Sequence, residues 1–118
     1  MQCTTHYPTR EKVISRTTLR LTDAAASDLA EIWKHIAVEA SEEIATRFLT
    51  CVVARFDQVL RFPMSGSPRP QLATHLRVIF HDNYAIYYLP RLNEIVIVRV
   101  LHGSRDLEAI AEEEGFAL

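Results

Sequence analysis

Two amphipathic helical patterns follow each other with almost no link between them, and this arrangement restricts the fold more than any other feature. In the first pattern, apolar residues recur at steps of three and four: Leu29, Ile32, Trp33, Ile36 and Ala40. In the second, the recurring apolar residues are Ala45, Phe48, Leu49, Val52, Phe56, Val59 and Leu60. Two such helices with so short a connection must fold back as an antiparallel hairpin.

The sequence also marks the ends of both helices. Thr22 or Asp23 can cap the first helix, and Ser41 can cap the second, because their side chains can accept a hydrogen bond from a free N–H of the first turn. Pro63 ends the second helix, since proline lacks a backbone donor and clashes with the preceding turn.

Outside the helices the apolar period changes to two, which is typical of strands. Four strands are predicted, at residues 17–21, 75–81, 84–89 and 94–102. A loop at residues 64–70, a tight turn at Asp82-Asn83 and a second turn at residues 90–93 connect the later ones. The last strand is apolar on both faces and is therefore expected to be central. Its two faces are Val96, Val98 and Val100 opposite Ile95, Ile97 and Leu101.

The predicted fold is α+β: an antiparallel helix hairpin packed on a small, mainly antiparallel four-stranded sheet. The element order is β-α-α-β-β-β, followed by a short acidic helix at residues 106–114. Residues 1–16 follow neither period and are expected to be a flexible N-terminal extension, so residues 17–118 make a single domain.

Composition and charge exclude several classes of protein. The chain has 118 residues, is 48% apolar and carries a net charge of −2, which excludes a disordered chain and disfavours sequence-specific DNA binding. No apolar stretch is long enough for a membrane span or a signal peptide, so a cytoplasmic location is expected. Cys3 and Cys51 make neither a disulfide framework nor a zinc site.

The charge is unevenly distributed. Residues 61–105 contain six arginines and two acids, whereas residues 106–114 contain five acids and no base. Two interpretations stay open for the arginines: solvated faces with some mutual pairing, or a surface that binds a partner.

The sequence lacks the residue patterns that are typical of a metal site, a cofactor site or a catalytic nucleophile. His75 and His81 would lie about 20 Å apart along one strand, and no paired histidines occur at metal-binding spacing. Ser65-Gly66-Ser67 lies in a loop without the strand-to-helix setting of a nucleophile elbow. We therefore expect no metal, no cofactor and no catalytic residue.

One polar cluster remains, at the end of the central strand, a place that proteins often use for binding. Its candidate target-binding residues are Arg99, His102, Arg105 and Asp106. A purely structural interpretation is equally open, in which Arg105 pairs with Asp106 and His102 is an ordinary residue of the sheet edge.

At these residues the chain resembles the RelE/ParE toxins of bacterial type II toxin–antitoxin systems, and it is most similar to the ParE branch. The resemblance covers about residues 18–114. It is carried, in this order, by Leu29-Ala30-Glu31-Ile32, Phe62-Pro63-Met64-Ser65-Gly66, Leu76-Arg77-Val78, Tyr84-Ala85-Ile86-Tyr87-Tyr88 and Arg99-Val100-Leu101-His102-Gly103-Ser104-Arg105-Asp106.

The resemblance implies one of two targets. RelE-type toxins cut messenger RNA on the ribosome, whereas ParE-type toxins bind DNA gyrase and block replication without hydrolysis. The acidic segment at residues 106–114 is unsuited to RNA phosphate, and an acid/base pair for attack by a ribose hydroxyl is missing. We therefore expect a non-enzymatic gyrase inhibitor, with RNA cleavage and a non-toxic binding module as alternatives.

The resemblance also implies a partner, a ParD-like antitoxin whose extended C-terminal segment wraps the toxin. Helices on a small sheet leave grooves and an open sheet edge that accept a partner's helix or strand. We expect Arg77, Trp33 and Tyr87 to contact the antitoxin, with the basic sheet section attracting an acidic segment.

Overall fold

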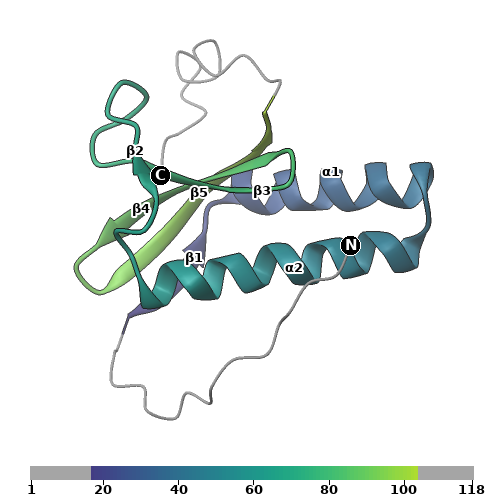
Figure 1. Ribbon diagram of the computed structural model, residues 1–118, viewed down its shortest axis with the longest axis horizontal. Coiled ribbons are helices and arrows are strands. Elements are labelled where there is room, and N and C mark those ends of the chain that lie inside the picture. The colour runs from purple at the N-terminus through teal and green to yellow at the C-terminus, as the bar shows by residue number, and fades with distance from the viewer. Residues whose placement is uncertain (1–16, 104–118) are drawn as a thin grey trace.

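The computed structural model describes residues 17–103 and confirms the α+β fold. Helices α1 (Asp23–Glu39) and α2 (Glu42–Arg61) form an antiparallel hairpin that packs against the sheet (Figure 1). The hydroxyls of Thr22 and Ser41 accept hydrogen bonds from N–H groups of the first helical turns at 3.0 and 3.1 Å. The expected caps therefore set the start of each helix.

The sheet is mixed and has five strands in the order β1-β5-β4-β3-β2. They are β1 (Thr18–Leu21), β2 (Ser67–Pro68), β3 (Arg77–His81), β4 (Tyr84–Arg91) and β5 (Glu94–His102). β1 pairs with β5 in parallel, and the other neighbours are antiparallel. β5 lies between β1 and β4, so the predicted central place of residues 94–102 is confirmed.

The structure corrects three details of the predicted strands. The expected loop at residues 64–70 contains β2, so the sheet has five strands rather than four. β3 begins only at Arg77, because His75 has a φ of 65° that a strand does not accommodate. β4 continues through Pro90, where a turn was predicted. Proline lacks an N–H, but this removes no hydrogen bond of the sheet, because β3 does not extend beside Pro90.

A β-bulge in β5 corrects the predicted faces of that strand. Tyr87 lies opposite Arg99 while Tyr88 lies opposite Ile97, which leaves Val98 as the extra residue. The alternation therefore reverses after the bulge: Val100 joins the core beneath the helices, and Leu101 lies in the cluster on the other side.

Two apolar clusters follow from the alternation of the strands. The larger lies between the helices and the sheet and includes Val52 and Phe56 of α2 against Ile86, Tyr88 and Ile97. The smaller lies on the opposite face of the sheet, and its members are Leu76, Val78, Ala85, Tyr87, Val96, Val98 and Leu101. Burial on both faces explains why β4 and β5 are so rich in apolar residues.

The short helix predicted at residues 106–114 and the extension predicted at residues 1–16 lie outside the described residues. Within residues 17–103, neither helix is long and apolar enough to cross a membrane.

Candidate functional site

Arg99, the first candidate at the end of the central strand, forms an ion pair with Asp28 of α1. Its Nε donates to Asp28 Oδ2 at 2.7 Å, and its Nη2 donates to Oδ1 at 2.9 Å. Both side chains are largely buried, at 14% and 13% exposed. The hydrogen bond to Asp28 is the main cause of the raised pKa of Arg99, and burial opposes it. This guanidinium is therefore held in one geometry by the fold.

Asp28 has a second role at the edge of β5. β1 ends at Leu21, and the hydroxyl of the following Thr22 donates to the Val98 carbonyl at 2.8 Å. Beyond that point no β1 residue lies beside β5, and Asp28 Oδ2 accepts a hydrogen bond from the Val100 N–H at 3.0 Å. The carboxylate thus replaces a strand partner and ties α1 to the last part of β5.

His102, the second candidate, lies exposed at the end of β5 in a row of aromatic rings. Its ring packs edge-on against Tyr84 with the ring centroids 5.2 Å apart, and Tyr84 packs edge-on against Phe48 of α2 with the centroids 5.5 Å apart. Phe48 also contacts the His81 ring at 5.3 Å. Burial raises the pKa of Tyr84 above its ordinary value. The row joins α2 to the strand ends through ring contacts.

The other two candidates at this end of the sheet, Arg105 and Asp106, lie outside the described residues. Arg99 and His102 are both near the end of β5, but their side chains have different neighbours. Arg99 contacts α1 through Asp28, whereas His102 contacts Tyr84 of β4.

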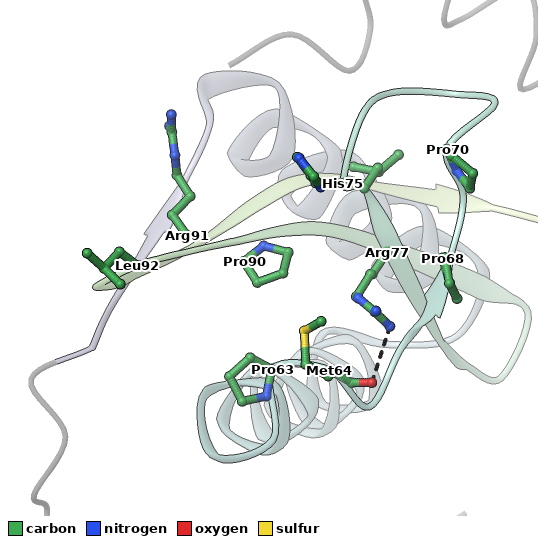
Figure 2. A pocket seen from close by; sticks show the side chains of 10 residues that line it. Pro63, Met64, Pro68, Pro70, His75, Arg77, Pro90, Arg91 and Leu92 are labelled. Atoms are coloured by element: carbon green, nitrogen blue, oxygen red, sulfur yellow. Dashed lines mark hydrogen bonds between the residues drawn. The ribbon is translucent and has the colours of Figure 1, made fainter.

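Arg77 holds the loop that follows α2. Its Nη1 donates to the Gly66 carbonyl and, at 3.2 Å, to the Met64 carbonyl (Figure 2). Tyr88, which is fully buried, donates to the Pro63 carbonyl at 2.7 Å and accepts from the Gly66 N–H at 2.8 Å. Two side chains of the sheet therefore fix residues 63–66 against β3 and β4.

Gly66 is required at this place for space. A Cβ there would lie 2.6 Å from the Tyr88 hydroxyl and 2.8 Å from the Val78 carbonyl, which is closer than real Cβ contacts. The run Phe62-Pro63-Met64-Ser65-Gly66 thus has a structural explanation: it ends α2 and packs its glycine under the tyrosine hydroxyl.

A groove of about 520 Å³ lies beside this loop, between the loop and the far end of β4. We call it the proline groove, after its lining residues Pro63, Pro68, Pro70 and Pro90, and Figure 2 shows Arg77 and Met64 between them. The end of the β4–β5 hairpin contributes Arg91 and Leu92 to the same groove.

The residues expected to contact an antitoxin lie on three different parts of the molecule. Arg77 lies in the proline groove. Trp33 lines a shallower groove of about 360 Å³ between the helices, where its Nε1 donates to the Thr46 hydroxyl at 3.1 Å. Tyr87 is buried in the smaller cluster. Burial raises the pKa of its hydroxyl, and the positive charge of Arg69 opposes this effect only in part. The structure does not bring these residues together.

Sequence reasoning missed Asp28 and Arg91 as residues of interest. Asp28 carried a signal, since it stands four positions before Ile32 and therefore on the apolar face of the helix, where an acid is unusual unless it is paired. Arg91 carried a weaker one, because it stands in a predicted hairpin turn with exposed Leu92.

Comparison with known proteins adds two findings. Residues 19–107 match the family described as the ParE toxin of the type II toxin–antitoxin system parDE. A solved structure described as the chromosomal ParDE toxin–antitoxin system from P. aeruginosa is 22% identical, with a TM-score of 0.65 over 74% of this chain and 96% of that one. This likeness shows a shared fold. No curated protein matches the sequence.

Proposed function

Because this chain belongs to the ParE toxin family of type II toxin–antitoxin systems, we propose that it inhibits growth by binding DNA gyrase and is neutralised by a ParD-like antitoxin. The observation that carries the proposal is the extent of the family match. It spans residues 19–107, and so includes both helices, strands β2 to β5 and all of β1 except Thr18.

The hydrogen bonds that Arg99 already makes within the fold support binding to a protein target rather than RNA cleavage. A nuclease needs cations that are available to the scissile phosphate and an acid/base pair beside it. Arg99 already donates two hydrogen bonds to the carboxylate of Asp28. A strand end whose guanidinium is held in one geometry suits the recognition of a protein surface better than proton transfer.

The antitoxin part of the proposal has separate support. The structurally similar protein from P. aeruginosa is described as part of a ParDE toxin–antitoxin system. The excess of arginine over acid in residues 61–105 of this chain matches the expectation of an acidic antitoxin segment.

The experiment is to induce the full chain alone in growing bacteria and to follow DNA and protein synthesis by pulse labelling. An early fall in DNA synthesis with filamentous cells is the expected result. Inhibition of supercoiling by purified gyrase in the presence of the purified chain tests the same target without the cell.

Other outcomes assign the chain differently. An early fall in protein synthesis with cleaved messenger RNA would favour the RelE-type ribonuclease, and unaffected growth would favour a non-toxic binding module. The antitoxin encoded by the same operon should restore growth when it is co-expressed, and its failure to do so would contradict the neutralisation part.

A further inference from the structure

The proline groove combines apolar walls with exposed apolar tips. Met64 is 65% exposed and Leu92 is 92% exposed, although both are apolar and line the same groove. Prolines on the walls present rigid apolar surface that loses little conformational entropy when a partner binds. This surface is therefore already shaped for a partner.

The charge of the groove has one sign. Arg77, Arg91 and His75 line it, and none of its lining residues is acidic. Glu94 at the start of β5 does not compensate for them, because it forms an ion pair with Arg20 of β1 at 2.9 Å. The groove therefore attracts a partner segment that carries carboxylates.

The two arginines of the groove retain donors for such a segment. Within residues 17–103, Arg77 donates through Nη1 alone, while its Nε and Nη2 bond to no other described residue. Arg91 is exposed and forms no hydrogen bond or ion pair with any residue of that part of the chain. A carboxylate in the groove can thus be bound without breaking the contacts that hold the loop.

Pro90 limits how the segment can bind. β4 extends past the first residue of β3, so Leu89, Pro90 and Arg91 have β5 on one side and no strand of the described sheet on the other. Proline has no N–H, and its nitrogen is tolerated in a strand only on the side without ladder bonds. A regular added strand is therefore disfavoured here, and recognition must depend on side chains.

We propose that the proline groove binds an extended, acidic segment of the antitoxin, with a carboxylate at Arg77 and Arg91 and apolar side chains against the prolines and Leu92. This inference rests on the proposed neutralisation by an antitoxin. It adds the site, the chemistry of the segment and a side-chain mode of recognition.

The first test is site-specific cross-linking in the complex. The photoreactive residue p-benzoylphenylalanine is placed at Leu92 of the full chain, and the antitoxin of the same operon is co-expressed with it. Mass spectrometry should then find adducts on an antitoxin segment rich in Asp and Glu. Val38, which is 77% exposed at the end of α1, provides the control position and should give fewer adducts of that segment.

The second test uses charge reversal away from the structural contacts. Arg91→Glu should weaken antitoxin binding about tenfold at low salt and by much less at high salt, because the attraction is electrostatic. Arg47→Glu, the same change at an exposed position of α2, should weaken it less than about twofold. Circular dichroism of both variants verifies that they fold.

The outcomes separate this inference from the proposed function. Tight binding of the antitoxin with equal effects of Arg91→Glu and Arg47→Glu would overturn the groove assignment alone. Adducts from Leu92 confined to a basic or neutral segment would overturn it as well. Absence of any antitoxin binding to the unaltered chain would overturn the neutralisation on which the inference rests.

Discussion

Replacing Asp28 by alanine should destabilise the protein more than most surface substitutions. The change removes the carboxylate that accepts from Arg99 Nε, Arg99 Nη2 and the Val100 N–H. It leaves a guanidinium whose side chain is only 14% exposed without the carboxylate of Asp28. Removing one partner of a buried ion pair costs about 3–5 kcal/mol, and residual exposure of both side chains places the expected loss near 3 kcal/mol.

Urea unfolding followed by tryptophan fluorescence measures this loss. Trp33 is the one tryptophan of the chain and lies on the same helix as Asp28. With a slope of about 1.5 kcal/mol per molar urea, a loss of 3 kcal/mol lowers the unfolding midpoint by about 2 M. A decrease below about 0.5 M would refute the idea that this ion pair holds α1 to β5.

A double variant separates stability from target binding. Replacing the pair by apolar residues of similar size, Asp28→Leu with Arg99→Met, should recover part of the lost stability. No charge is then left unpaired, but the Val100 N–H still lacks the acceptor that Asp28 provided. If Arg99 also contacts gyrase, the stable double variant should still have lost toxicity. Full toxicity in a stable double variant would remove Arg99 from the target-binding residues and leave it a structural one.

Three further predictions concern the loop after α2 and the buried tyrosines. Gly66→Ala should destabilise by about 1–3 kcal/mol, because its Cβ would collide with Tyr88 and the Val78 carbonyl. Gly103→Ala should change the urea midpoint little, because a Cβ there would lie 3.4 Å from the Asn83 carbonyl, an ordinary contact. Tyr88→Phe should lower stability by about 1–3 kcal/mol in thermal unfolding, since it leaves a buried N–H and a carbonyl without their partner, and Tyr84→Phe is the matched control. Burial raises the pKa of Tyr84 and Tyr87 above the ordinary 10.0, so these hydroxyls ionise at a lower pH in the unfolded chain than in the folded protein. Their contribution to the free energy of unfolding is therefore fully present below pH 10 and should be lost as the pH rises further. Absorbance at 295 nm should show late ionisation in the native protein, and a native titration at the model-compound midpoint would contradict it.

The local features of the fold are readable in the sequence because they depend on neighbours in the chain. Apolar steps of three and four predict both helices, and the hydroxyls of Thr22 and Ser41 cap them as expected. The alternation in residues 84–89 and 94–102 likewise predicts two strands, and apolar residues on both faces of the second predict its central place in the sheet.

The candidate site was predicted only in part. Residue type and position at the end of the last strand identified Arg99 and His102, but a sequence does not state which partners a charged side chain finds. Asp28 and Arg99 are 71 positions apart, and only the packing of α1 on β5 brings them within 2.7 Å. The same is true of Tyr88 and Gly66, whose contact gives the Phe62-Pro63-Met64-Ser65-Gly66 motif a structural role that the sequence did not show.

The sequence by itself determined the helix hairpin, four of the five strands and the excess of arginine in residues 61–105, since periodicity, capping and composition are properties of neighbouring residues. Tertiary structure alone decided the bulge at Val98, the ion pair of Arg99 and the groove that gathers four prolines with Arg77 and Arg91. Those features depend on strand register and on contacts between distant segments. A shift of one residue in register moves every side chain of a strand to the other face of the sheet, and the sequence of the strand does not show at which residue that shift occurs.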